Sequence, residues 1–134
     1  MDEQEVQDLA KYRLEQSKEN LEEAETLFKV NKYKGASNRA YYSIFHAVKA
    51  VLALEQTDFK KHSSVIAYFN KNYISTNIFS RDLGKRVSEA RFLREKSDYV
   101  DFYIVTKDEC KTQIETAKLM IENAEKYINK KLNK

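Results

Sequence analysis

Arg39 and His46 lie seven positions apart in the segment NRAYYSIFHAVKAVLAL, whose apolar pattern predicts a helix. Seven residues make almost two helical turns, so both side chains should emerge from one face, roughly 10 Å apart along the axis. Arginine is permanently charged and matches the shape of a phosphate group, whereas histidine transfers protons near neutral pH. The pair therefore has the residue types needed for chemistry at a phosphate.

Cleavage of RNA without a metal ion is one reaction that suits these two side chains. The imidazole can take the proton from a 2′-hydroxyl group, and the guanidinium can stabilise the charge that builds on the phosphoryl oxygens. One such site has no second group to protonate the leaving oxygen. Two subunits that pack their central helices together would bring two Arg39 and two His46 side chains into one cleft.

The same pair is also compatible with packing alone or with binding alone. A histidine on an aromatic-rich helix is often a neutral interior residue, and Arg39 can pair with a carboxylate from another helix, such as Glu22, Glu23 or Asp98. The pair can also bind a nucleotide or a partner protein without cleaving anything, with Arg39 on a phosphate and His46 orienting it. The residue types alone do not separate catalysis, binding and packing.

The composition predicts one all-α domain that spans residues 1–134. The chain has no proline and only two glycines, and it is rich in Lys, Glu, Leu, Ala and Asn, which favours helices with short connections. We expect an up-and-down bundle of four to five helices. The net charge of +3, from 24 basic and 21 acidic residues, does not by itself indicate a nucleic-acid binder.

The sequence also predicts a cytoplasmic protein without a metal or another cofactor. One cysteine excludes an intramolecular disulfide, and two histidines with one cysteine supply too few good ligands for zinc. No N-terminal apolar run resembles a signal peptide, and no stretch approaches the ~20 apolar residues that span a bilayer. We therefore expect no membrane association.

Apolar spacing predicts helices at about 3–31, 36–55 and 80–95, a shorter helix after residue 61, and a long final helix. A corner is expected at 31–35, and residues 97–103 look irregular or extended. Thr106 and Glu109 match a capping box that would begin the last helix. The side chains expected to point inward from the third, fourth and last helices are Val65, Ile66, Phe69, Tyr73, Phe79, Leu83, Val87, Ala90, Leu93, Cys110, Ile114, Ala117, Ile121, Ala124 and Ile128.

The second helix is apolar over much of its circumference, so it should be central and packed on more than one side. One face carries Ala40, Tyr41, Ile44, Phe45, Val48, Val51 and Leu52, and another carries Arg39, Tyr42, Ser43, His46, Lys49 and Ala50. The residues beside the Arg39–His46 pair that we expect to bind substrate are Asn38, Tyr42, Ser43 and Lys49.

Four further residues carry specific expectations. His62, near the start of the third helix, should have a capping or surface role, and Tyr41 should lie at a bundle or dimer interface. Asp98 should contact an arginine and, with Tyr99, fix the loop before the last helix.

The segment from Ala36 to Ala47, with its Tyr-Tyr pair ahead of Phe-His, resembles the core helix of HEPN domains (higher eukaryotes and prokaryotes nucleotide-binding). Residues 61–66 with Phe69, and residues 93–99, resemble later blocks of the same family, and the likeness spans residues 9–127. The resemblance implies a small stand-alone prokaryotic member, commonly a homodimer. It further implies a metal-independent ribonuclease of a toxin–antitoxin-like pair, whose antitoxin is often a minimal nucleotidyltransferase.

The nuclease motif of that family is an arginine, four to six residues, and a histidine, so the resemblance makes His46 the proton-transfer residue and Arg39 the phosphate clamp. Active members frequently place Asn, Asp or His directly after the arginine, whereas this chain has Ala40 there and Asn38 before it. Val48 stands where some toxins carry a tyrosine that their antitoxin modifies with AMP. The alternative that the resemblance allows is a catalytically inactive module that binds a nucleotide or a nucleotidyltransferase.

Overall fold

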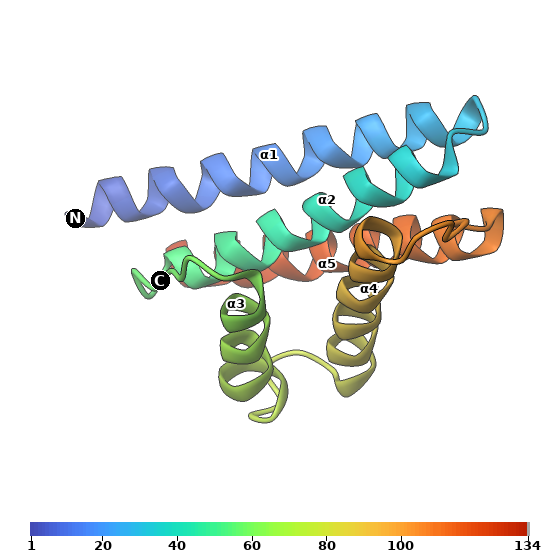
Figure 1. Cartoon of the computed structure of the whole chain (residues 1–134). Coiled ribbons are helices and arrows are strands. Elements are labelled where there is room, and N and C mark those ends of the chain that lie inside the picture. The colour runs from blue at the N-terminus through green and yellow to red at the C-terminus, as the bar shows by residue number, and fades with distance from the viewer. Residues whose placement is uncertain (134) are drawn as a thin grey trace.

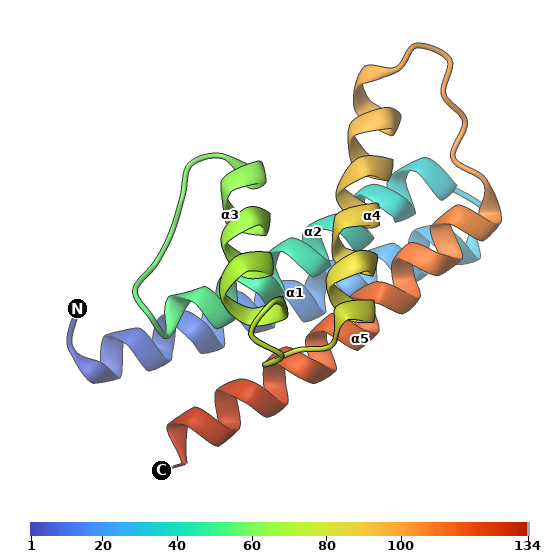
Figure 2. The same ribbon diagram turned by 90° about the horizontal axis from the view of Figure 1, so that it is seen from below.

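The computed structural model describes residues 1–133, which form five α-helices and one π-helical turn. Helices α1, α2 and α5 run side by side, and α3 and α4 project from one side of that layer (Figures 1 and 2). The elements are α1 (Glu3–Lys29), α2 (Tyr33–Ala53), α3 (His62–Phe69), the π-helical turn η1 (Asn70–Ile74), α4 (Arg81–Tyr99) and α5 (Lys107–Leu132). The predicted all-α helical bundle is confirmed, while Lys134, the end of the predicted domain, lies outside the described residues.

Helix α1 begins at a capping box and ends at a left-handed residue. The Asp2 carboxylate accepts a hydrogen bond from the Glu5 amide at 2.8 Å, and the Glu5 carboxylate accepts one from the Asp2 amide at 3.4 Å. After Lys29, Asn31 has φ of 63°, a conformation that asparagine tolerates, and the chain reverses into α2. The reversal lays α1 against α2 along the most extensive helix contact of the fold.

Helix α2 is central, because it contacts α1, α3, α4 and α5. It begins at Tyr33 rather than at residue 36, since the Ala36 amide already donates to the Lys32 carbonyl at 2.9 Å. The predicted corner is therefore shorter and covers only residues 30–32. The residues of the predicted core face are all buried, as expected: Ala40, Tyr41, Ile44, Phe45, Val48, Val51 and Leu52.

The third and fourth helices form a hairpin with aromatic contacts at its tip. The ring centroids of three aromatic residues lie 5.6–6.1 Å apart: Phe69, Tyr73 and Phe79. These rings pack the end of α3, the π-helical turn and the residues just before α4 against one another. Ser80 caps α4 by accepting a hydrogen bond from the Leu83 amide at 3.1 Å. The inward positions predicted for these helices are buried, except for Leu93, which is half-buried.

Helix α4 continues to Tyr99, so the prediction that residues 97–99 are irregular was wrong. Two ion pairs one helical turn apart, Arg91–Glu95 and Arg94–Asp98, each at 2.8 Å, link the end of the helix to its middle. Such pairs stabilise a helix by about 0.2–0.5 kcal/mol each. The expected contact of Asp98 with an arginine is confirmed, and the irregular segment is limited to residues 100–106.

Helix α5 begins at the predicted capping box. The Glu109 amide donates to the Thr106 hydroxyl and the Thr106 amide donates to the Glu109 carboxylate, both at 3.0 Å. All six predicted positions of its apolar stripe are buried, and burial raises the pKa of the Cys110 thiol to about 11. Cys110 is therefore a small neutral core residue, as expected. Across residues 1–133, every helix falls short of the length and apolar character that crossing a membrane requires.

We expect Gly84→Ala to lower the free energy of unfolding by about 1–3 kcal/mol, as overpacking of a core does. A Cβ atom at this position of α4 would lie 2.7 Å from Cγ2 and 2.9 Å from Cγ1 of the buried Ile74 side chain. Chemical denaturation measures the loss.

Gly35→Ala is the matched control, because its Cβ atom would approach only Leu27, at 3.4 Å, and alanine is the better helix former. A Gly84 variant as stable as the wild type would contradict this packing of α4 on η1.

Candidate functional site

Helix α2 exposes a narrow strip of polar side chains between its neighbours. Arg39, Tyr42, His46 and Lys49, which we call the α2 polar strip, follow one another at intervals of three or four residues and are each at least partly exposed. Residues with that spacing share one face of a helix. Helix α1 borders the strip on one side, and the start of α3 and the end of α4 border it on the other (Figure 1).

His46 is held by an amide of α1. Its Nδ1 atom lies 2.8 Å from Oδ1 of Asn20, and the Nδ2 atom of the same amide donates to Oε1 of Glu23 at 3.0 Å. An ionised carboxylate only accepts hydrogen bonds, so the NH₂ group of Asn20 faces Glu23 and its oxygen faces His46. The proton of the neutral imidazole is therefore on Nδ1, and Nε2 carries the lone pair.

Arg39 joins the same network through Glu23. Its Nε atom lies 3.8 Å from Glu23 Oε1, and the two side chains are 47% and 51% exposed. The expectation that Arg39 pairs with a carboxylate of another helix is thus confirmed. An ion pair as exposed as this one contributes at most about 1 kcal/mol, so a phosphate group can replace the carboxylate at small cost.

The surroundings of His46 favour its neutral form. Burial lowers its pKa below the ordinary value of 6.5, and the nearby positive charges of Lys49, Arg13 and His62 lower it further. At pH 7 the ring is therefore uncharged, with its Nε2 lone pair free. That is the protonation state a proton acceptor needs.

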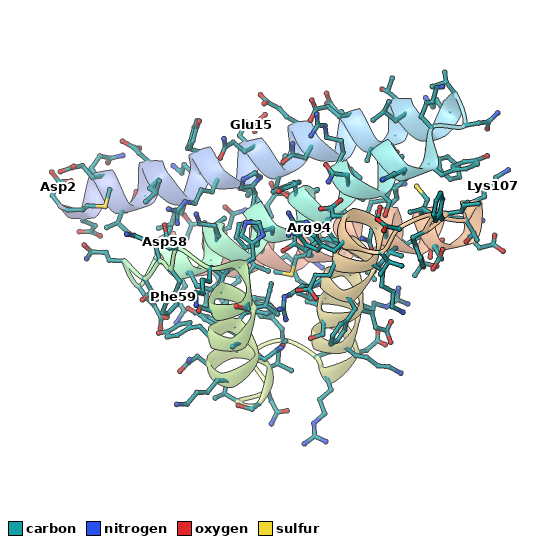
Figure 3. All side chains as sticks on the ribbon, viewed as in Figure 1. Asp2, Glu15, Asp58, Phe59, Arg94 and Lys107 are labelled. Carbon is teal, nitrogen blue, oxygen red and sulfur yellow. The ribbon has the colours of Figure 1, made fainter. Side chains whose placement is uncertain are left out.

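Two cations share a single carboxylate at the far end of the strip. Lys49 Nζ lies 3.3 Å from Asp58 Oδ1, and Arg13 Nη2 lies 3.1 Å from Asp58 Oδ2. Arg13 also donates from Nη1 to the Lys49 carbonyl at 3.2 Å. Asp58 itself lies on the connection between α2 and α3 (Figure 3). The two positive charges outnumber the one negative charge, so this end can attract a phosphate backbone.

Arg94 forms the opposite wall, at the end of α4 that meets α2 (Figure 3). Its Nη2 atom donates to the Tyr42 hydroxyl at 3.4 Å, and its guanidinium carbon lies 5.5 Å from the Tyr41 ring centroid and 5.9 Å from that of Tyr42. The guanidinium therefore fixes Tyr42 against the bundle. The ring of Tyr42 in turn lies 6.1 Å from that of His46.

His62 does not have the capping role expected for it, although it is partly exposed at the surface. It is the first residue of α3 and stacks on Phe45 with ring centroids 4.0 Å apart. Its Nδ1 atom lies 3.1 Å from the hydroxyl of Tyr41. Tyr41 is fully buried inside the bundle, which is one of the two interfaces expected for it.

The structure brings together some of the candidate substrate-binding residues and not others. Tyr42 and Lys49 lie on the α2 polar strip, and Asn38 lines a recess of about 360 Å³ beside Arg39. Ser43 is the exception, because it is fully buried and its hydroxyl donates to the Ser17 carbonyl at 2.8 Å. Ser43 therefore fixes α2 to α1 and cannot reach a substrate in this structure.

Asn20 is the site residue that the sequence did not reveal. The side of α1 that contacts α2 carries three polar residues, four and three positions apart: Arg13, Ser17 and Asn20. Three polar residues at positions where a core side chain is expected form a detectable signal. Their partners on α2, however, depend on the register of the two helices, which the spacing does not give.

Ala40 is fully buried among small and apolar residues of α1 and α5. A polar residue at this position would point into the bundle and away from the α2 polar strip. The polar neighbour of Arg39 on the outside is Asn38, which is half-buried. Having Ala40 in place of the Asn, Asp or His that active members frequently carry therefore takes no polar side chain away from the surface of Arg39 and His46.

A family model described as "HEPN domain" matches residues 10–127. A relative from Methanocaldococcus jannaschii named "Putative toxin" is 31% identical over 115 residues, which cover 86% of this chain and 78% of the relative. A UPF0332 protein of Thermotoga maritima is 30% identical over 124 residues, which cover 92% of this chain and 94% of the relative. A second Methanocaldococcus jannaschii protein named "Putative toxin" is 31% identical over 86% of this chain and 85% of its own length.

We expect ¹⁵N NMR to show the neutral His46 ring protonated at Nδ1, with a pKa below 6.5, because Asn20 accepts from Nδ1 and burial disfavours the charged ring. Asn20→Ala should shift the ring toward the Nε2-protonated tautomer. Asn123→Ala, on the exposed side of α5, is the matched control. A wild-type ring protonated mainly at Nε2 would contradict the assigned network.

Proposed function

The chain belongs to the HEPN domain family, and we propose that it is a metal-independent ribonuclease whose site is the α2 polar strip. His46 takes the proton from a 2′-hydroxyl group at Nε2, and Arg39 binds the phosphoryl oxygens. The observation that carries the proposal is the Nδ1 bond of His46 to Asn20, because it leaves Nε2 unprotonated on an accessible face. The lowered pKa of His46 supports the same role.

The charges of the strip support an RNA substrate in particular. Arg39 stands at one end of the strip, and Lys49 with Arg13 at the other, so cations flank His46 along the helix. A single-stranded backbone that crosses the strip would place one phosphate at Arg39 and a neighbouring one near Lys49. Asn38 and the ring of Tyr42 would contact the sugar and base beside the scissile bond.

The names of the relatives support a toxin role. Two of them carry the name "Putative toxin", and each matches this chain over 86% of its length. The proposal is therefore extended to the toxin or defence component of a toxin–antitoxin-like pair that acts in the cytoplasm. The protein would work as a homodimer with two strips close together, and a minimal nucleotidyltransferase would serve as its antitoxin.

An inactive binding module is the second candidate. The ion pair of Arg39 with Glu23 favours it, because the pair occupies the guanidinium in the absence of substrate. Such a module would recognise a nucleotide or a partner nucleotidyltransferase, with Arg39 holding a phosphate and His46 orienting it. Calorimetry with nucleotides beside an RNA assay separates the two functions, since saturable binding without product supports the module.

We expect His46→Ala to slow RNA cleavage by about 10²–10⁴-fold, the usual contribution of a proton-transfer residue, and to abolish toxicity in cells. End-labelled RNA incubated with EDTA measures the rate, and the wild type should leave a 2′,3′-cyclic phosphate and a 5′-hydroxyl end.

Lys111→Ala is the matched control, since this lysine lies exposed on α5, and circular dichroism confirms that both variants are folded. Unchanged cleavage by the folded His46 variant would reject the proposed function.

A further inference from the structure

Cleavage through a 2′-hydroxyl group needs two proton transfers. The attacking oxygen loses a proton while the leaving 5′-oxygen gains one, and the two oxygens lie on opposite sides of the phosphorus. His46 supplies one transfer, so within one subunit the α2 polar strip has no donor for the leaving oxygen. We propose that His62 of the same subunit is a second catalytic residue, which protonates the leaving 5′-oxygen from Nε2. The inference rests on the proposed function and deepens it.

His46 and His62 lie against the same two aromatic rings. The imidazole of His62 is 4.0 Å from the ring centroid of Phe45 and 5.9 Å from that of Tyr42, and His46 is 6.0 and 6.1 Å from the same two centroids. The two imidazoles therefore cannot be farther apart than the two Phe45 distances added together. Both imidazoles therefore border the same aromatic patch of α2, as two groups that act on one phosphodiester must.

The two histidines are held in the same way. His46 is anchored through Nδ1 by Asn20, and His62 is anchored through Nδ1 by the hydroxyl of Tyr41 at 3.1 Å. Within residues 1–133, neither Nε2 atom has a hydrogen-bond partner. Both residues are also partly exposed, so each combines an unpaired nitrogen with access to the surface.

The charges around the pair keep both imidazoles from being protonated together. Burial lowers the pKa of His62, and the positive charges of Arg94, Lys49 and Arg91 lower it further. The charged and titratable groups that surround the two rings are Arg13 of α1, Tyr41, Tyr42 and Lys49 of α2, Arg91, Arg94, Glu95 and Asp98 of α4, and Asp58 of the connection between α2 and α3.

A bound phosphodiester would raise the pKa values of the two histidines again in part. Its negative charge neutralises the cations that depress the two pKa values, and it favours one added proton on the pair. His46 must keep its Nε2 lone pair to act as the base, so in the productive form of the proposed complex the added proton lies on His62. The complex then holds one neutral and one protonated imidazole, which are the forms that a base and an acid require.

The proposed step balances within the site. The 2′-O–H bond breaks as its proton moves to His46 Nε2, and the 2′-oxygen forms a bond to phosphorus. The bond from phosphorus to the 5′-oxygen breaks, and that oxygen takes the proton from His62 Nε2. The products are a 2′,3′-cyclic phosphate and a 5′-hydroxyl end, and exchange with water restores both histidines.

The test compares ordinary RNA with RNA that has sulfur in place of the scissile 5′-oxygen. A thiol has a pKa of about 8.5, so a thiolate leaves without a proton donor, whereas an alkoxide does not. We expect His62→Gln to slow cleavage of ordinary RNA by about 10²-fold or more, and to match the wild type on the sulfur substrate. His46→Gln should stay slow on both substrates, because sulfur does not replace the base.

Lys61→Gln, the exposed neighbour of His62, is the matched control and should match the wild type on both substrates. Wild-type protein that cleaves neither substrate would defeat the proposed function itself. Wild-type cleavage combined with an unimpaired His62→Gln, or with a loss that sulfur does not restore, would overturn only the role of His62.

The pH dependence of the wild type gives a measurement that needs no variant. An acid that must be protonated makes the rate on ordinary RNA fall at alkaline pH, and the sulfur substrate should lose that alkaline limb and keep the acidic one. A profile on ordinary RNA without an alkaline limb would also overturn the inference.

Discussion

The hydrogen bond between Asn20 and His46 is the constraint on which the chemistry of this fold depends. It crosses from α1 to α2, sets the tautomer of the imidazole, and leaves the lone pair on Nε2 of a partly exposed ring. Because the same amide also contacts Glu23, one side chain determines the orientation of His46 and the position of the carboxylate that pairs with Arg39. The two motif residues are therefore linked through α1, although along α2 they stand two turns apart.

The bond forms only if α1 and α2 pack in the correct register, and buried polar groups fix that register. The Ser43 hydroxyl donates to the Ser17 carbonyl, and Ser17 bonds in return to the Ser43 carbonyl. A shift along the helices would leave these groups buried and unpaired, at a cost of about 1–3 kcal/mol each. The serine pair thus specifies one alignment among those that the apolar stripes alone would allow, and this alignment places Asn20 beside His46.

The sequence was sufficient to predict the helices, the buried stripes and the common face of Arg39 and His46, because each depends on spacing within one segment. It failed where the outcome depends on contacts between segments. Ser43 was assigned to the exposed face of α2, yet α1 covers that position. His62 and Asn20 acquire their roles only when other helices bring them to α2, and local spacing contains no information about which residues will meet. The end of α4 was misplaced for a different reason: its apolar pattern is weak, and the ion pairs that extend it lie within the helix itself, at a spacing of four residues.

Each carboxylate beside the α2 polar strip forms an ion pair with a cation of the strip or of its border. Glu23 pairs with Arg39, Asp58 with Lys49, and Asp98 with Arg94. Each carboxylate holds a flexible cation in place before substrate arrives, which reduces the side-chain entropy that binding would otherwise cost. Because the Arg39 and Lys49 pairs include half-exposed carboxylates, each contributes at most about 1 kcal/mol, and in the proposed complex each would give way to the phosphates of the substrate. The Arg94–Asp98 pair is more buried. In the proposed complex it would therefore stay in place and keep Tyr42 and the aromatic rings beside both histidines fixed while the outer cations exchange carboxylate for phosphate.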